Sequence, residues 1–254
     1  MKIVITGASS GLGRALAIQY GAKGFQLCLI ARREDKLHAL KNQISSKCEV
    51  YAGDVTNRNE IERIASEFIS RYGPPDIVIA NAGISLGTYA AARQSNDELN
   101  EVMKTNFFGM IYTCQAFIDS MALAGSGTLV GISSLAGLRG IPGSSAYSSS
   151  KAAAISYLES LRVELRNSGV RVLTVCPGYI RTPMTDVNTF KMPFLMDVES
   201  AAQSLIGAVE RKKSFHVMPW QMALVGFILR RLPNWIYDWF ASRAPRKPIT
   251  QKNK

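Results

Sequence analysis

The chain has 254 residues, a net charge of +11 and a hydrophobic share of 47%. This composition allows one large α/β domain or two small ones, and it excludes an intrinsically disordered chain. Four cysteines without close or metal-type spacing, and only two histidines, argue against a zinc site, and we expect no metal.

The first predicted element is a strand at Lys2–Thr6, which a glycine-rich turn and a helix at Gly11–Gly24 follow. The strand is too short for a signal segment, so we expect a cytosolic protein. The turn, TGASSGLG at 6–13, permits a tight bend and a close approach of the backbone to a pyrophosphate at the helix N-terminus. Its position between the first strand and the first helix predicts a dinucleotide site.

A second strand is predicted at Phe25–Ala31, and Arg32 and Arg33 follow it. An acidic residue at this point would accept hydrogen bonds from the ribose of NAD and repel a phosphate. Arg32 instead predicts a contact with the 2′-phosphate, and therefore NADP. The alternative is a solvated basic turn that opens the next helix.

The remaining elements continue the alternation of strands and helices. Further strands are predicted at Glu49–Gly53, Asp76–Ala80, Thr128–Ile132, Val170–Cys176 and Phe215–Met218, and further helices after Val55 to about Arg71 and at Ser95–Lys104, Asn106–Ala124 and Tyr147–Asn167. This order predicts an α/β, Rossmann-like, doubly wound parallel sheet in three layers with right-handed crossovers. Ligands of such sheets bind beyond the carboxyl ends of the strands, where the polar motifs of this sequence fall.

Tyr147 and Lys151 are four residues apart, so a helix places both side chains on one face. A phenol has a pKa near ~10, and a neighbouring ammonium lowers that pKa and suits the tyrosine for acid–base chemistry. A serine upstream, Ser133 or Ser134, would hold a substrate oxygen against the phenol. The alternative for this segment is an ordinary surface helix start.

Seven motifs occur together: TGASSGLG (6–13), GDV (53–55), NAG (81–83), Asn106, ISS (132–134), YSSSK (147–151) and PGYIRTPM (177–184). In this order and spacing the chain resembles the classical short-chain dehydrogenase/reductase (SDR) family, of the NADP-preferring type, over about residues 1–217. One departure is Gly131, where the family often has asparagine before Ile-Ser-Ser. The departure bears on local hydrogen bonding rather than on the catalytic group.

The resemblance implies four catalytic residues. Tyr147 would exchange the proton with the substrate oxygen, and Lys151 would lower the pKa of that tyrosine and bind the ribose. Ser134 rather than Ser133 would polarise the oxygen, because it lies thirteen residues before Tyr147, a usual family spacing. Asn106 would support a water relay to Lys151.

The resemblance also implies a set of NADP(H) contacts. These are Gly7, Ser9, Ser10, Gly11, Leu12, Gly13, Arg32, Asp54, Val55, Asn81, Ala82, Gly83, Tyr147, Lys151, Pro177, Gly178, Ile180 and Thr182. The glycines would hold the pyrophosphate and Arg32 the 2′-phosphate. Asp54 and Val55 would flank the adenine, Asn81 would shape the cleft, and Thr182 would contact the nicotinamide carboxamide.

The C-terminal part differs from the body. Residues 211–254 contain 10 Lys and Arg against 1 Asp or Glu, a net charge of +9, whereas residues 1–210 have a net charge of +2. We therefore divide the chain into a catalytic domain at 1–217 and a basic, aromatic-rich helical tail at 218–254. The apolar segments of the tail are shorter than the roughly 20 residues that span a bilayer. Two compatible interpretations of the tail remain. It is a lid over the substrate pocket or a subunit contact, or it is an interfacial helix at an anionic membrane surface, which would place the protein at the inner face of a membrane.

Two classes of function remain. The first is an NADPH-dependent oxidoreductase that transfers a hydride between the nicotinamide and a carbonyl or secondary alcohol. Its small-molecule substrate would be hydrophobic, such as a long-chain, steroid or isoprenoid compound. The second is a non-catalytic NADP-binding sensor or scaffold on the same fold, which we would expect to lack one of the catalytic residues. The family resemblance implies a homodimer or homotetramer, and we expect no nucleic-acid partner.

Overall fold

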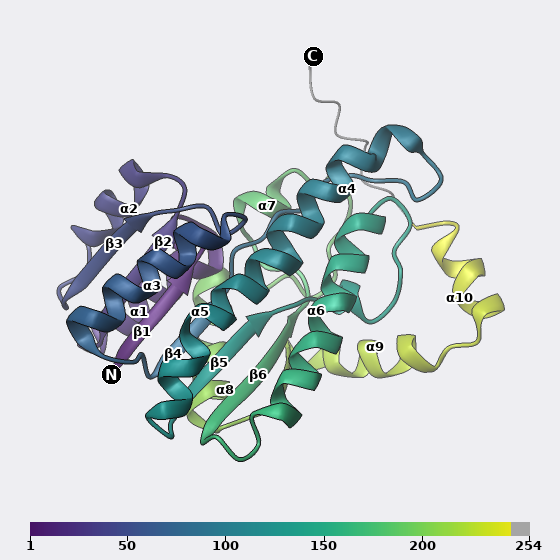
Figure 1. Cartoon of the computed structure of the whole chain (residues 1–254). Coiled ribbons are helices and arrows are strands. Elements are labelled where there is room, and N and C mark those ends of the chain that lie inside the picture. The colour runs from purple at the N-terminus through teal and green to yellow at the C-terminus, as the bar shows by residue number, and fades with distance from the viewer. Residues whose placement is uncertain (245–254) are drawn as a thin grey trace.

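The computed structural model describes residues 1–244, and it has a parallel seven-stranded sheet at its centre (Figure 1). The strands lie in the order β3-β2-β1-β4-β5-β6-β7. They are β1 (Lys2–Thr6), β2 (Gln26–Ala31), β3 (Cys48–Ala52), β4 (Ile77–Ala80), β5 (Gly127–Ile132), β6 (Val170–Pro177) and β7 (Phe215–Met218). Each strand that the sequence predicts is present, with ends that differ by one residue at most.

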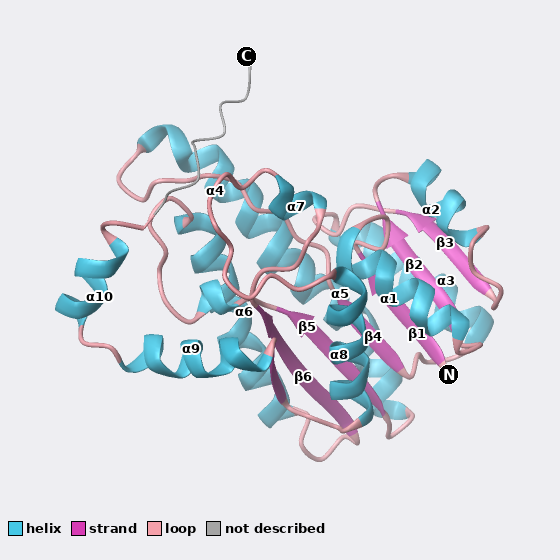
Figure 2. Ribbon diagram, turned by 180° about the vertical axis from the view of Figure 1, so that it is seen from behind, coloured by secondary structure: helices cyan, strands magenta, loops and turns pink. Residues whose placement is uncertain are grey.

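Helices cover both faces of this sheet, and Figure 2 shows the second face. They are α1 (Gly11–Ala22), α2 (Glu34–Lys41), α3 (Arg58–Tyr72), α4 (Asn96–Met103), α5 (Gly109–Leu123), α6 (Ser145–Glu164), α7 (Pro183–Asp186), α8 (Val198–Glu210), α9 (Trp220–Arg231) and α10 (Asn234–Ala241). The core on one face contains side chains of α1, α2 and α8, and the core on the other face contains side chains of α3, α5 and α6. The fold is therefore the predicted three-layer, Rossmann-like α/β domain.

The strands are apolar at successive positions because both of their faces are covered. Ile3 and Ile5 of β1 belong to one core, and Val4 between them belongs to the other. Side chains alternate between the two faces of a strand, so a run of β-branched residues fills both cores at once. The strands therefore lack an alternation of polar and apolar residues, a pattern that is typical of a parallel sheet covered on both faces.

The segment around Asn106 differs from the prediction of two separate helices, Ser95–Lys104 and Asn106–Ala124. A π-helical turn at Lys104–Phe108 joins α4 to α5 without a break. Such turns are rare and occur mostly at functional sites. Here Asn106 lies within the turn and is buried, with an exposed fraction of 1%.

The departure at Gly131 also has a structural cause. Gly131 lies in β5 under α6, and a Cβ atom at this position would collide with Cδ1 and Cδ2 of Leu158. The Leu158 side chain is fully buried and belongs to the core on the α3, α5 and α6 face. Leucine therefore occupies the space that a larger residue at position 131 would need.

We predict that Gly131→Ala lowers the free energy of unfolding by about 1–3 kcal/mol, because it overpacks this contact. Leu158→Ala alone should lower the same quantity by about 2–5 kcal/mol through the cavity that it leaves. In the double variant the methyl group enters that cavity, so the combined loss should be smaller than the sum by about 1 kcal/mol or more. Urea denaturation of the four proteins measures the coupling, and strictly additive losses would contradict the packing argument.

Candidate active site

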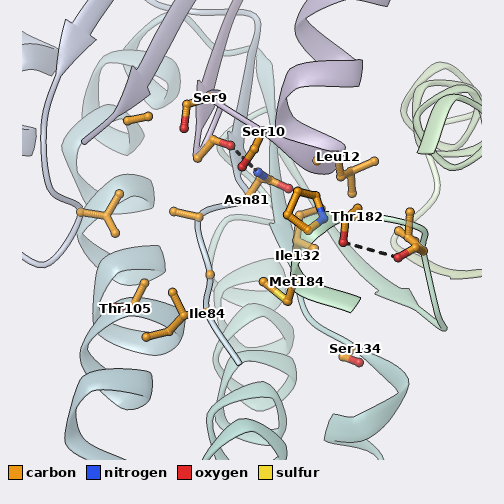
Figure 3. Close-up of a pocket in the computed structure, with 18 of the residues that line it drawn as sticks. Ser9, Ser10, Leu12, Asn81, Ile84, Thr105, Ile132, Ser134, Thr182 and Met184 are labelled. Atoms are coloured by element: carbon orange, nitrogen blue, oxygen red, sulfur yellow. Dashed lines mark hydrogen bonds between the residues drawn. The ribbon is translucent and has the colours of Figure 1, made fainter. Parts of the chain in front are cut away.

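A cavity of about 370 Å³ opens at the carboxyl edge of the sheet, and Figure 3 shows residues that line it. The sheet changes its winding direction between β1 and β4, which are neighbours in space but not in sequence. Crevices form at such switch points because the flanking crossovers leave in opposite directions. All the predicted site residues except Gly13 and Asn106 line this cavity.

The cavity is also lined by residues outside the predicted set of contacts, although Ser133 was a candidate and several others lie within the quoted motifs. These residues are Ala31, Arg33, Gly53, Ile84, Thr105, Ile132, Ser133, Pro183, Met184 and Thr185. Most of them are direct neighbours of predicted residues and could have been found by adjacency. Ile84 and Thr105 lie outside the quoted motifs but are adjacent to Gly83 and Asn106.

The glycine-rich turn packs directly against the end of β4. Gly7 has a φ of +67°, and a Cβ on it would lie 2.8 Å from Cα of Ala82. A Cβ on Gly13 would lie 2.5 Å from the carbonyl oxygen of Gly7, so this residue shapes the turn from behind the cavity. Only glycine fits these two positions, and the turn leads into the N-terminus of α1 at Gly11. Backbone N–H groups there form a cradle that suits a pyrophosphate.

Hydrogen bonds join the ends of β1 and β4 beneath this turn. The Thr6 hydroxyl oxygen accepts from the backbone N–H of Asn81 at 3.1 Å and of Ala82 at 3.3 Å. The Asn81 amide donates to the carbonyl oxygen of Thr6 at 3.0 Å. Asn81 therefore fixes the ends of β1 and β4 to each other at the cavity, and its role toward a cofactor remains a prediction.

Two arginines that follow β2 line the cavity beside the glycine-rich turn. Arg32 lines the cavity, as predicted. The Arg33 guanidinium, which the sequence analysis did not single out, donates from Nη2 to the hydroxyl groups of Ser9 and Ser10, both at 2.9 Å. The second basic residue of the pair thus lies across the glycine-rich turn. Because Arg33 directly follows Arg32 in the sequence, this adjacency could have indicated that Arg33 also belongs to the site.

Ser134, Tyr147 and Lys151 come together from β5 and α6. The Lys151 ammonium is buried, donates to the carbonyl oxygen of Ile132 at 2.7 Å and lies 5.7 Å from the centroid of the Tyr147 ring. The Ser133 hydroxyl donates to the backbone oxygen of Lys151 at 2.8 Å. These two bonds hold the start of α6 against the end of β5. Ser133 is thereby structural. The Ser134 hydroxyl accepts from the Ala136 N–H at 3.1 Å and donates to the carbonyl oxygen of Pro177 at 3.5 Å, and its predicted catalytic role remains a prediction.

Burial dominates the electrostatics of this group. It raises the pKa of the Tyr147 phenol, and a hydrogen bond with Ser134 lowers that pKa only in part. Burial also lowers the pKa of Lys151 to about 8. The net shift of the tyrosine pKa is therefore upward, opposite to the lowering expected from Lys151, because loss of hydration disfavours the phenolate. At neutral pH the phenol keeps its proton and can donate it.

Asn106 acts on the backbone near the site. Its Oδ1 accepts from the N–H of Ile84 at 2.8 Å, and its Nδ2 donates to the carbonyl oxygen of Ile84 at 2.9 Å and to the Ser150 hydroxyl at 3.1 Å. These bonds fix the segment after β4 to α6, one residue before Lys151. The water relay remains a prediction.

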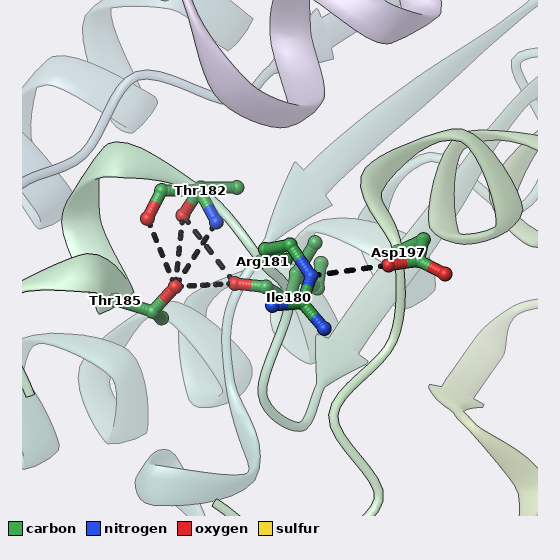
Figure 4. Close-up of polar contacts among 5 residues, drawn as sticks. All are labelled: Ile180, Arg181, Thr182, Thr185 and Asp197. Carbon is green, nitrogen blue, oxygen red and sulfur yellow. Dashed lines mark hydrogen bonds and ion pairs between the residues drawn. The ribbon is translucent and has the colours of Figure 1, made fainter.

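Thr182 is held by its own loop, as Figure 4 shows. The Thr185 hydroxyl accepts from the Thr182 N–H at 3.0 Å and donates to the carbonyl oxygen of Ile180 at 2.6 Å. On the outer side of the loop, Arg181 pairs with Asp197 at 3.2 Å. The threonine side chain is therefore positioned at the cavity wall, where it suits a carboxamide contact.

The tail contributes to the site only indirectly. Among residues 1–244, none from α9 or α10 lines the catalytic cavity. A Cβ on Gly178, which does line it, would lie 3.0 Å from Cγ of Met222 in α9. Instead of covering the cavity, α9 supports its wall.

The glycine cradle at a switch point and the Ser–Tyr–Lys group together define an oxidoreductase site for a nicotinamide dinucleotide. The sequence profile of the family described as short chain dehydrogenase matches residues 1–192. The chain therefore belongs to the short-chain dehydrogenase family, as the motifs predicted.

Three similar proteins illustrate the range of this family. An uncharacterized oxidoreductase of Myxococcus xanthus is 38% identical over 244 residues, which span 94% of this chain and 96% of that protein. The 11-beta-hydroxysteroid dehydrogenase-like protein 4A of Arabidopsis thaliana is 33% identical over 228 residues, 85% of this chain and 76% of that protein. A solved structure of an alcohol dehydrogenase from Thermococcus sibiricus, complexed with 5-hydroxy-NADP, superposes on this chain with a TM-score of 0.75 and 26% sequence identity. The superposed region spans 85% of this chain and 94% of that chain.

The pKa of Lys151 predicts a pH dependence of stability. The lysine pKa falls from 10.5 to about 8 in the fold, so between these values the unfolded chain binds more protons than the folded chain. The free energy of unfolding of the wild type, relative to Lys151→Met, should therefore rise with pH across this window, by up to about 3 kcal/mol. Chemical denaturation at a series of pH values between these two pKa values measures this difference, and a difference that does not vary with pH would contradict the burial of a titrating ammonium.

Proposed function

We propose that the protein is an NADP(H)-dependent oxidoreductase that transfers a hydride between the nicotinamide and a carbonyl or secondary alcohol. The observation that carries this proposal is the meeting of Ser134, Tyr147 and Lys151 in the same cavity as the glycine cradle. A binding-only protein has no use for a proton donor next to a cation and a hydroxyl group. The same residues serve both directions of the reaction.

The residues of the chain perform the proton chemistry and the positioning. A bound nicotinamide dinucleotide would supply or accept the hydride. In reduction, Tyr147 donates its phenol proton to the substrate oxygen, a role that its raised pKa suits. The Ser134 hydroxyl donates a hydrogen bond to the same oxygen. Lys151, with a pKa of about 8, is mostly charged at neutral pH, and it stabilises the phenolate left behind and binds the ribose hydroxyls.

The preference for NADP rests on the two arginines after β2. Arg32 lines the cavity and would bind the 2′-phosphate, and Arg33 lies beside it on Ser9 and Ser10. Guanidinium groups form strong, charge-assisted hydrogen bonds with phosphate. The Thermococcus sibiricus relative, which is complexed with an NADP derivative, supports the same cofactor here.

We propose a hydrophobic substrate. The cavity wall includes Ile84 and Met184 in addition to the polar catalytic group. A similar protein of Arabidopsis thaliana is named for a hydroxysteroid dehydrogenase, which supports an apolar alcohol or ketone.

We also propose a homodimer or homotetramer in which α5 and α6 form the interface. Leu123 on α5 and Val163 on α6 are apolar and exposed in the single chain, as an uncovered interface would require. Light scattering at micromolar concentration checks this assembly, and a monomer would contradict it.

The first prediction for this function concerns the cofactor. NADPH should bind at least about tenfold more tightly than NADH, because a charge-assisted contact contributes on the order of 1.5–3 kcal/mol. Arg32→Asp should weaken NADPH binding by about tenfold or more and leave NADH binding nearly unchanged. Fluorescence titration measures both affinities. The matched charge reversal Arg166→Asp, on an exposed residue that does not line the cavity, should change neither. Equal affinities in the wild type would contradict the proposed preference.

The second prediction concerns the proton. Tyr147→Phe should lower turnover by at least about 10²-fold with NADPH binding nearly intact, because only the transferable proton is lost. Lys151→Ala should lower turnover and also weaken NADPH binding. Tyr157→Phe removes a hydroxyl group from the same helix outside the cavity and should keep wild-type turnover. A Tyr147→Phe enzyme with full activity would exclude the mechanism. A wild-type protein that binds NADPH but turns over no carbonyl or alcohol would favour the sensor or scaffold role.

A further inference from the structure

The tail carries an exposed apolar surface on two consecutive helices. Its members are Trp220, Leu224, Phe227 and Ile228 of α9 and Trp235, Trp239 and Phe240 of α10, all exposed. In α9 these residues are spaced at i, i+4, i+7 and i+8, and in α10 at i, i+4 and i+5. Such spacings place the side chains along one face of each helix. Trp220 and Trp235 are 75% and 74% exposed, although tryptophan is usually buried to a large extent. A cluster of this kind marks an interaction site.

The two helices are fixed to the body rather than loosely attached. Arg139 donates from Nη1 to the carbonyl oxygens of Leu229 and Leu232, at 2.8 and 2.6 Å, and from Nη2 to Oδ1 of Asn234 at 2.8 Å. Its guanidinium lies 4.2 Å from the centroid of the Tyr237 ring. One arginine therefore holds the end of α9, the linker and the start of α10.

The position of this arginine links the tail to the site. Arg139 lies in the loop between Ser134 and Tyr147, so the tail is tied to the segment that joins two catalytic residues. The Tyr237 hydroxyl donates to the carbonyl oxygen of Gly140 in the same loop. Figures 1 and 2 both show α9 and α10 on the side of the molecule where α6 lies, away from α2 and β3.

Cations border the apolar surface. The Arg231 guanidinium lies 3.7 Å from the centroid of the Phe227 ring, and that of Arg243 lies 4.3 Å from the centroid of Trp239. These are cation–π distances, so these two positive charges are held at aromatic rings of the surface. In the sequence 211–254 the only acidic residue is Asp238. An aromatic surface with a positive border results.

We propose that this surface docks on an anionic lipid bilayer, with α9 and α10 lying in the headgroup region. Aromatic and aliphatic side chains beside arginines are the composition of interfacial helices, and the anionic leaflet attracts each basic residue by on the order of 1 kcal/mol. A second copy of the chain fits less well, because it would oppose one positively charged tail with another. Within residues 1–244 no helix is both long enough and apolar enough to cross a bilayer.

The docking has a consequence for the substrate, and this consequence alone rests on the proposed function. A second cavity, of about 860 Å³, lies between α10 and the loop at 137–143, with Tyr237 and Ala241 on one wall and Leu138 and Ile141 on the other. Docking through α10 would bring this loop to the lipid surface. An apolar ketone or alcohol could then leave the bilayer close to the site without crossing water.

The experiment uses the tryptophans as reporters, because all three lie in the proposed surface. Full-length protein is mixed with vesicles of phosphatidylcholine alone or of phosphatidylcholine with phosphatidylglycerol. We expect a blue shift of the emission, quenching by brominated lipid, and co-sedimentation that is at least about tenfold stronger with the anionic vesicles and weaker at high salt. Absence of these changes with anionic vesicles would overturn the proposal.

Variants distinguish binding through this surface from non-specific hydrophobic binding to vesicles. Trp235→Ser with Trp239→Ser should lower the partition coefficient by at least about tenfold, with Trp220 left as the reporter. Phe215→Ser removes an exposed aromatic ring of β7 outside the surface and should leave partition unchanged. Equal losses in both variants would overturn the assignment, as would a blue shift that follows protein concentration without vesicles, which would identify a second copy as the occupant.

Separate assays distinguish a failure of the proposed reaction from a failure of the proposed membrane docking. Partition is measured without substrate, so its outcome decides the docking surface whatever the activity is. Activity on a short, water-soluble carbonyl without vesicles tests the proposed reaction alone, and the tail variants should keep it. Only activity on a long-chain carbonyl supplied in vesicles should fall in the Trp235→Ser/Trp239→Ser variant, to about the same extent as binding.

Discussion

The parallel pairing of β1 with β4 is the constraint on which the rest of the site depends. The two strands pair at Ile3–Ile77 through Ile5–Ile79, although more than seventy residues separate them in the chain. Parallel alignment brings all carboxyl ends to one edge, and the reversal of winding at this pair opens the edge into a crevice. The Thr6 hydroxyl then closes the floor of the crevice by binding the backbone after β4. The glycine turn from β1 and the catalytic residues after β5 face each other only because of this pairing.

Burial sets the chemistry of the catalytic group. An ammonium that is taken out of water needs compensation, and Lys151 receives it from the carbonyl oxygen of Ile132 at the end of β5. Burial disfavours the charged forms of both residues, so it raises the pKa of the phenol and lowers the pKa of the ammonium. The lysine therefore contributes by its position and charge rather than by a net depression of the tyrosine pKa.

The tail is bound to the α/β domain by hydrogen bonds from a single arginine, although none of the described tail residues lines the catalytic cavity. Arg139 binds backbone carbonyls at the C-terminal end of α9, where unsatisfied oxygens and the negative end of the helix dipole favour a cation. The same residue belongs to the loop between Ser134 and Tyr147. The tail is therefore tied directly to the loop between these two residues.

The sequence by itself determined the strands and their order of appearance, because apolar runs of β-branched residues and local turn motifs depend on neighbouring residues alone. It determined Tyr147 and Lys151 as a pair for the same reason, since one helical turn separates them. Most of the cavity residues were predicted from the resemblance of the motifs to the short-chain dehydrogenase family. Only the tertiary structure decided the π-helical turn at Asn106, the place of Arg33 across the glycine turn, and the clamp of Arg139 on the tail. Each of these depends on contacts between segments that are distant in the chain, such as Asn106 with Ile84 and Arg139 with Leu232. The direction of the Tyr147 pKa shift belongs to the same group, because desolvation arises from the packing of the whole domain and not from the four-residue spacing.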